Sequence, residues 1–232
     1  MKKQKGTVLI ACGLVLLAAA LGLTVYNMQT ELEAGRQSAK ALGALKKHTA
    51  SELVQTAPLS GETGSSDPVE TFPELSSLPE YAQFPDMEMP TVEVDGHAYV
   101  GTLRIPELGL ELPVMSEWSY PKLKKAPCRF SGSAYQNNLI LIAHNYASHF
   151  GNLKRLMPGA EVTFTDMAGN VFCYAVAETE ILKPRQMEEL VGTDYPLTLL
   201  TCTIGGETRV TVRCEKTREI PVKSHDAQLE KE

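Results

Sequence analysis

The stretch Leu197-Thr198-Leu199-Leu200-Thr201-Cys202 decides the fold, and Arg209-Val210-Thr211-Val212-Arg213 follows it after a turn that contains Gly205 and Gly206. Alternating β-branched and apolar residues bounded by glycines are typical of β-strands. The first of these strands ends on a thiol, and the second begins with a guanidinium. A side chain at the end of a strand can face a cleft, so this pair of strands predicts a site at one end of a sheet.

A third apolar run, residues 139–143, ends just before His144 and Asn145. Two strands that each deliver one reactive side chain predict a Cys/His pair assembled in space. Because a thiolate attacks a carbonyl and a thiol does not, such a site must supply a base or positive charge. His144 would supply the base and then return a proton to a departing amine. Arg209 stays protonated and can donate two parallel hydrogen bonds.

The run Thr198-Leu199-Leu200-Thr201-Cys202, with His144 before it and Arg209 after it, resembles the signature of sortases. These are membrane-anchored cysteine transpeptidases of Gram-positive bacteria, and the resemblance covers roughly residues 97–217. It implies a mostly β fold, a closed barrel of about eight strands with short helices. It also implies that Cys202 is the nucleophile, that His144 is the acid and base, and that Arg209 stabilises the oxyanion. No cofactor is implied.

Each of these residues also has an ordinary structural interpretation. A strand cysteine is usually core, a lone histidine is usually a satisfied polar group, and an arginine at a strand start is usually solvated. Their order along the chain favours the functional interpretation. Arg213 competes with Arg209, because an even offset leaves both on one strand face; Arg209 is preferred because it is nearer Cys202 across the turn. His149 is the second candidate histidine and is predicted to be exposed.

Three further residues are candidates for substrate binding: Thr201, Asn145 and Trp118. Thr201 is assigned to the pocket by the family resemblance. Asn145 either orients His144 or caps a turn. Trp118, in the loop of residues 116–125, either forms a wall of the substrate groove or packs as a plug. No acidic cluster has the spacing of a calcium loop, so no metal site is predicted.

Composition excludes some functions and leaves others open. The chain carries 22 basic and 28 acidic residues, a formal net charge of −6, which argues against a nucleic-acid-binding protein. Its five cysteines show no CxxC spacing, so neither a zinc site nor a disulfide framework is indicated. Cys173 and Cys214 lie in strand-like runs and are predicted to pack as small hydrophobic side chains. A disulfide between them is the alternative.

The N-terminus predicts a membrane anchor. Residues 7–26 carry no charge and, as a helix, span a hydrocarbon core of about 30 Å. Lysines precede this run and acidic residues follow it, which places the N-terminus in the cytoplasm and the catalytic domain outside the cell membrane. A cleaved signal peptide is the alternative, but the apolar run is long for one.

The remaining segments complete the predicted organisation. Met28, Leu32, Ala39, Leu42 and Leu45 roughly follow helical spacing. We interpret this helix as a juxtamembrane stalk, in preference to one docked on the barrel. Residues 49–92 hold six prolines and eight acidic residues but no lysine or arginine, typical of a spacer; a strap over the domain within residues 72–89 is the alternative. The predicted segments are a basic cytoplasmic tail (1–6), the anchor (7–26), a juxtamembrane helix (27–48), the linker (49–92), the catalytic domain (93–218) and a polar tail (219–232).

The implied reaction has two steps. Cys202 cleaves a C-terminal sorting motif of a secreted protein to form a thioacyl-enzyme, which an amine of a lipid-linked cell-wall precursor or a pilin lysine then resolves. The short connection between Cys202 and Arg209 favours an anchoring or housekeeping subclass over a pilin-polymerising one. Two alternatives remain open: a Cys/His hydrolase that uses water, and a membrane-tethered binding barrel without catalysis.

Overall fold

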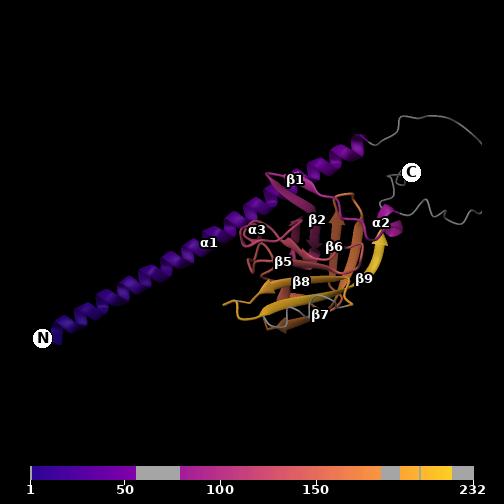
Figure 1. The fold of residues 1–232 in the computed structure, drawn as a ribbon. Helices are drawn as coiled ribbons and strands as arrows, with labels where there is room; N and C mark the ends of the chain where they lie inside the picture. Colours follow the sequence, from indigo (N-terminus) through magenta and orange to yellow (C-terminus); the bar gives the residue numbers. More distant parts are fainter. Residues whose placement is uncertain (1, 56–78, 184–193, 204, 221–232) are drawn as a thin grey trace, which may run out of the picture.

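The computed structural model describes residues 2–55, 79–183, 194–203 and 205–220. Short strands dominate these residues, as expected for a mostly β protein, and one long helix precedes them (Figure 1). The elements are α1 (Lys2–Gln55), α2 (Glu80–Gln83), β1 (Val92–Val94), β2 (His97–Ile105), η2 (Pro106–Leu108), β3 (Leu110–Met115), α3 (Tyr120–Leu123), β4 (Cys128–Ser131), β5 (Leu139–Ala143), η3 (Leu153–Arg155), β6 (Glu161–Asp166), β7 (Val171–Leu182), β8 (Leu197–Cys202) and β9 (Arg209–Ile220).

Eight strands close into a barrel. Their order is β2-β3-β4-β5-β8-β9-β7-β6, and β6 pairs back onto β2 to complete the ring. The β3–β4 and β5–β8 pairings are parallel, and the other pairings are antiparallel. β1 lies outside the ring and pairs with the first residues of β2. The predicted closed eight-stranded barrel is therefore confirmed.

The barrel interior is filled by side chains that alternate along each strand. In β6 and the first half of β7, every second residue is buried, as a strand with one face on the core requires. Phe164, Phe172 and Tyr174 are among the largest fully buried side chains. In β5 every residue is buried, because its outer face is covered as well. Strands covered on both faces read as continuous apolar runs.

A second apolar cluster covers the outside of β5 and β8. Ile140, Ile142 and Leu200 belong to it, whereas Leu141 and Leu199 belong to the interior core. Residues from the preceding loop and from the long helix complete the outer cluster, among them Leu123 and Leu45. One face of β5 and β8 is thus turned to the interior and the other to a covered outer surface.

Helix α1 docks on the barrel and is not a free stalk. It runs unbroken past the apolar segment and crosses one side of the barrel (Figure 1). A stripe with spacings of four, three and four residues is buried there: Ala34, Ser38, Ala41 and Leu45. Small residues let the helix approach closely, and Leu45 joins the outer cluster. The docked arrangement, which the sequence analysis ranked second, is the one observed.

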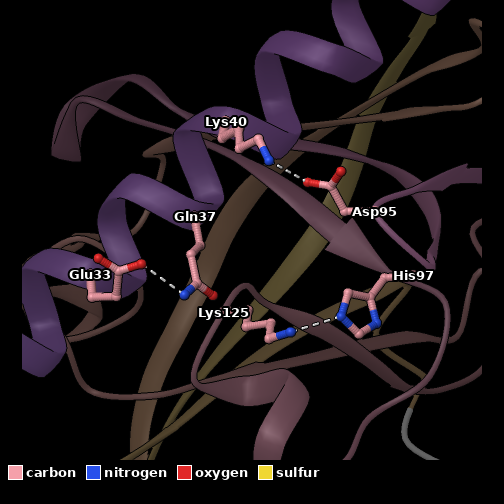
Figure 2. A network of polar contacts seen from close by, with 6 residues as sticks. All are labelled: Glu33, Gln37, Lys40, Asp95, His97 and Lys125. Atoms are coloured by element: carbon pink, nitrogen blue, oxygen red, sulfur yellow. Dashed lines mark hydrogen bonds and ion pairs between the residues drawn. The ribbon is translucent and has the colours of Figure 1, made fainter.

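Ion pairs and hydrogen bonds border the docked helix (Figure 2). Lys40 Nζ lies 2.8 Å from Asp95 in the turn between β1 and β2. Below it, Lys125 Nζ lies 2.9 Å from His97 Nε2 at the start of β2. Burial, together with the nearby Lys125 charge, lowers the pKa of His97. Exposed pairs of this kind contribute little stability, so apolar packing is the larger part of the docking energy.

The later part of the predicted spacer is packed against the barrel. Tyr81 of α2 is buried and stacks on Tyr135, with ring centroids 4.8 Å apart. Met89 is also buried in the interior core. The extended spacer predicted for residues 49–92 therefore does not apply to residues 79–92, where the strap interpretation describes the structure. Residues 56–78 lie outside the described residues.

The two longest strands, β7 and β9, have 12 residues each. β7 continues to Leu182 and pairs with β9 along its whole length, with two register shifts that bend the ladder. β9 continues to Ile220, beyond the predicted end of the catalytic domain at residue 218. Residues 184–193 and the end of the chain from residue 221 lie outside the described residues.

Candidate active site

Three adjacent strands bring the predicted catalytic residues to one end of the sheet. β5 and β8 run parallel, and their last registered pair is Ala143 with Thr201. His144 follows the first of these residues and Cys202 the second. On the other side of β8, Cys202 is registered with Arg209. Since neighbouring strands are about 4.8 Å apart, the three residues form one row.

The alternation of side chains places this row on the outer surface. In β8, Leu199 faces the interior core and Leu200 faces the outer cluster. Continuing the alternation turns Thr201 inward and Cys202 outward. Cys202 is accordingly half-buried, whereas Thr201 is 4% exposed. Cys202 is therefore not one of the fully buried residues of the barrel interior.

Thr201 links the two strands that carry the thiol and the imidazole. Its hydroxyl donates a hydrogen bond to the carbonyl of Ala143, at 2.9 Å. This bond fixes the end of β8 to the residue that precedes His144. The structure thus shows Thr201 in a buried supporting contact, and its predicted part in substrate binding stays a prediction.

His144 is half-buried and electrostatically biased toward its neutral form. Burial lowers its pKa, and the positive charge of Lys124 lowers it further. Its Nε2 is buried and makes no hydrogen bond with the described residues. A neutral imidazole with one unsatisfied nitrogen can accept a proton from a nearby thiol. This arrangement fits a general base.

The loop that carries His144 is compact. The Tyr146 ring lies between the two histidines, 4.9 Å from His144 and 5.6 Å from His149. The backbone N–H groups of Phe150 and Gly151 donate to the carbonyls of His144 and Tyr146, at 3.2 and 2.9 Å. His149 is fully buried, and burial together with the nearby His144 lowers its pKa to about 4. The prediction that His149 is exposed was wrong.

Helix α1 reaches this same loop. The carboxylate of Glu31 accepts a hydrogen bond from the backbone N–H of Ala147. A side chain at Gly35 would meet Ser148, its Cβ lying 3.2 Å from the serine Cβ. Sequence reasoning missed this contact because it followed large apolar residues; Met28 and Leu32 are exposed. The pattern that could have predicted this contact is the stripe of small residues that ends at Leu45.

Arg209 lies beside Cys202 and is partly held by its own turn. Its Nη1 donates to the carbonyls of Gly206 and Thr208, at 2.8 and 3.0 Å. Thr203 and Thr208 close this turn through their backbone and hydroxyl groups. A guanidinium has five N–H donors, so these two bonds leave donor capacity for a substrate.

Arg213 is held by contacts away from Cys202. Only 4% exposed, it pairs through Nε with Glu180 at 2.9 Å and donates through Nη1 to Thr198 at 3.3 Å. Its guanidinium also lies 5.6 Å from the ring centre of Tyr195. It is registered with Thr198, four residues back along β8 from Cys202. The structure thus brings Arg209, and not Arg213, into the row.

An aromatic groove adjoins the outer cluster. Trp118 is 42% exposed and packs against Phe130, with ring centroids 5.8 Å apart. The groove has a volume of about 480 Å³ and is lined by Ser116, Glu117, Trp118, Arg129, Phe130, Ser131 and Gly132. Phe130 packs on the cluster that contains Leu200, so the groove borders the face that carries Cys202. Asn145 is exposed on the loop beyond His144.

Cys12, Cys128, Cys202 and Cys214 are free thiols. Cys214 is buried and Cys173 is half-buried, and they are not registered with each other in the β7–β9 ladder, where Cys214 faces Val176 and Cys173 faces Arg218. Burial raises the pKa of Cys128 and Cys214 to about 12, so both are unreactive. Packing, the preferred interpretation for Cys214, describes its position.

Residues 103–217 match the family model described as "Sortase domain". The chain belongs to the sortase family. Solved structures similar to it include sortase A from Corynebacterium diphtheriae (19% identity, 55% of this chain and 64% of that chain, TM-score 0.49), the pilus-related sortase C of group B Streptococcus (26%, 56% and 70%, 0.47) and sortase C1 from Streptococcus suis (26%, 61% and 80%, 0.47). No curated protein matches it.

Proposed function

We propose that this sortase is a membrane-anchored transpeptidase in which Cys202, His144 and Arg209 carry the reaction. The observation that carries the proposal is the register of three neighbouring strands, which sets the three residues in one row on a half-covered outer face. The family match supports a cysteine transpeptidase in general.

In the first step, His144 takes the proton of the Cys202 thiol, and the thiolate attacks the carbonyl carbon of a substrate peptide bond. The oxyanion that forms is stabilised by Arg209 and by a backbone N–H near Cys202. The carbon–nitrogen bond then breaks, and His144 returns the proton to the departing amine. The acyl group remains on Cys202 as a thioester.

In the second step, an amine attacks the thioester carbonyl. His144 takes the proton of the amine, a new amide bond forms, and the Cys202 sulfur leaves as a thiolate that regains the proton from His144. Substrates are secreted proteins with a C-terminal sorting motif, and the acceptor is a lipid-linked cell-wall amine or a pilin lysine. Trp118 lines the groove in which the sorting motif binds, and Asn145 contacts the motif from the exposed loop beyond His144. Thr201 acts from beneath the site, through its buried bond to Ala143.

The N-terminal helix supports the membrane anchor. Its apolar part has a window with a mean hydropathy of 2.4, none of it is buried in the protein, and it is long enough to cross a bilayer. We place the N-terminus in the cytoplasm because lysines precede the apolar run. The barrel then stands on the outer surface of the cell membrane.

The test uses the full chain in detergent with a library of sorting-motif peptides and an added amine. Transpeptidation predicts a thioacyl adduct on Cys202 by mass spectrometry and an amine-linked product. A product formed only with water would instead indicate a hydrolase. Cys202→Ala should abolish both adduct and product while unfolding at the same temperature as the parent chain.

Thiol labelling separates an enzyme from a non-catalytic barrel. A methanethiosulfonate reagent should modify Cys202 rapidly, because Cys202 is only half-buried and ends the strand next to the one that leads to His144. Cys173→Ser is the matched control, since Cys173 is also half-buried but lies far from the row. Equal labelling of the parent chain and Cys202→Ala would contradict the proposal.

A further inference from the structure

A groove of about 600 Å³ separates the middle of α1 from α3. It is lined on one side by the helix and on the other by the segment around α3: Tyr26, Gln29, Thr30, Glu33, Ala34 and Gln37 face Tyr120, Pro121, Lys124 and Lys125. None of Cys202, His144 and Arg209 lines it. The three residues proposed to carry transpeptidation therefore lie outside this groove.

The groove lies at the height where a bilayer would end. Tyr26 closes the uncharged run of residues 7–26 and is 63% exposed, and α1 first bonds to the barrel at Glu31. Five residues of helix cover about 7.5 Å. The headgroup layer outside a hydrocarbon core of about 30 Å is roughly 5 to 7 Å thick on each side. The lower part of the groove is therefore level with the lipid headgroups.

The side chains here suit a lipid surface. Tyr120 is 74% exposed, and its ring meets that of Trp118 edge-on, with centroids 5.9 Å apart. Tyrosine and tryptophan are enriched where a membrane meets water. Tyr26 and Tyr120 line the groove, and Trp118 packs beside Tyr120.

The charges of the groove favour an anion. Lys124 is exposed and Lys125 is half-buried, near His97. Glu33 is the acidic residue in the lining, and it accepts a hydrogen bond from Gln37 at 2.9 Å. Two lysines against one glutamate leave a net positive groove at the base of the barrel. A lysine near an anionic bilayer contributes about fivefold to the binding equilibrium.

We propose that this groove binds the phosphate of an anionic phospholipid headgroup, with Lys124 as its cation and Tyr26 and Tyr120 against the lipid. The inference rests on the proposed membrane anchor. Figure 1 shows α3 and the turn between β8 and β9 on the side of the barrel that faces the N-terminal half of α1. A bound headgroup therefore holds the catalytic end of the barrel toward the membrane.

The only tryptophan of the chain reports on this contact. The full chain is reconstituted into vesicles of phosphatidylcholine, with or without phosphatidylglycerol, that carry a trace of lipid with a nitroxide on its headgroup. We expect the nitroxide to quench Trp118 strongly in phosphatidylglycerol vesicles and several-fold less in phosphatidylcholine alone. High salt should weaken the difference, because the attraction is electrostatic.

Two charge reversals on opposite sides of the docking region form a matched pair. Lys124→Glu should reduce the quenching several-fold, because each unit of charge changes the equilibrium for binding the anionic bilayer roughly fivefold. Lys47→Glu makes the same change on α1 about 30 Å beyond Tyr26, which exceeds the screening length of about 8 to 10 Å. In Lys47→Glu, the nitroxide should quench Trp118 as strongly as in the parent chain. Thermal unfolding checks that both variants are folded.

Flotation separates the two possible failures. If the parent chain does not float with vesicles, the anchor itself is absent, and this inference falls with it. If the chain floats but Trp118 is not quenched, or if Lys124→Glu and Lys47→Glu behave alike, the anchor stands and headgroup binding is overturned. Equal quenching with and without phosphatidylglycerol would also overturn headgroup binding.

Discussion

Cys202 and Arg209 face each other as a registered pair in the antiparallel ladder of β8 and β9. The turn between them holds the arginine through two carbonyls, so its guanidinium is positioned before any substrate binds. A positioned charge stabilises a developing oxyanion without the cost of reorganisation. The short connection between β8 and β9 therefore serves to place the arginine beside the thiol.

The two arginines of β9 should respond differently to substitution. We expect Arg209→Ala to lower kcat by about 10²- to 10³-fold, because an oxyanion donor is lost, with little change in stability. Arg213→Gln should leave kcat near that of the parent and lower the free energy of unfolding by about 1 to 3 kcal/mol, since it breaks the bond to Glu180. Steady-state kinetics and urea unfolding measure both. The reverse pattern would assign the site to Arg213.

Lys124 should contribute to the pH dependence of catalysis. Burial is the larger cause of the lowered pKa of His144, and the charge of Lys124 lowers it further because it disfavours the protonated imidazole. Lys124→Gln removes this charge, and the limb of the kcat/KM profile that reports His144 should move to higher pH. Lys122→Gln is the control, because Lys122 lies in α3, two residues before Lys124, and pairs with Glu117. A limb that moves equally in both variants, or moves down, would contradict the assignment.

His149 should make the folded state sensitive to acid. Its pKa is lowered from 6.5 to about 4 in the folded protein, so the unfolded chain binds a proton first as the pH falls. Stability is therefore complete above pH 6.5 and declines between pH 6.5 and 4, by about 2 kcal/mol between pH 7 and pH 5. His149→Leu should flatten this part of the curve. Denaturant titrations at both pH values measure the difference, and an unchanged slope in His149→Leu would exclude His149 as its origin.

Gly101 should be needed to close the barrel. A Cβ at this position would meet the carbonyl of Thr165 and lie 2.6 Å from Phe164 Cζ, both in β6. Gly101→Ala therefore forces β2 and β6 apart, and we expect it to cost about 1 to 3 kcal/mol or more. Gly43→Ala in α1, where nothing lies within 4 Å, should instead stabilise the helix by up to about 1 kcal/mol. Thermal unfolding of the pair tests this, and a neutral Gly101→Ala would refute the close approach.

Much of the catalytic row could be predicted from sequence because strand signals are local. The continuous apolar runs before His144 and Cys202 mark strands covered on both faces, and the glycine turn marks the hairpin that returns to Arg209. The burial of His149 could not be predicted in this way. The ring packed against it belongs to Tyr146, and the helix beside it lies more than a hundred residues earlier in the chain. The choice between Arg209 and Arg213 likewise needed the position of Glu180, which comes from a different strand.

By itself, the sequence determined the strands, the uncharged helix and the order of thiol, imidazole and guanidinium along the chain, since hydrophobic periodicity and turn residues act over a few positions. Only the tertiary structure decided that α1 packs on the His144 loop and that Tyr81 is stacked in the core. Those contacts join segments far apart in the chain through small residues and single rings, and such packing depends on shape in three dimensions, which no local pattern encodes.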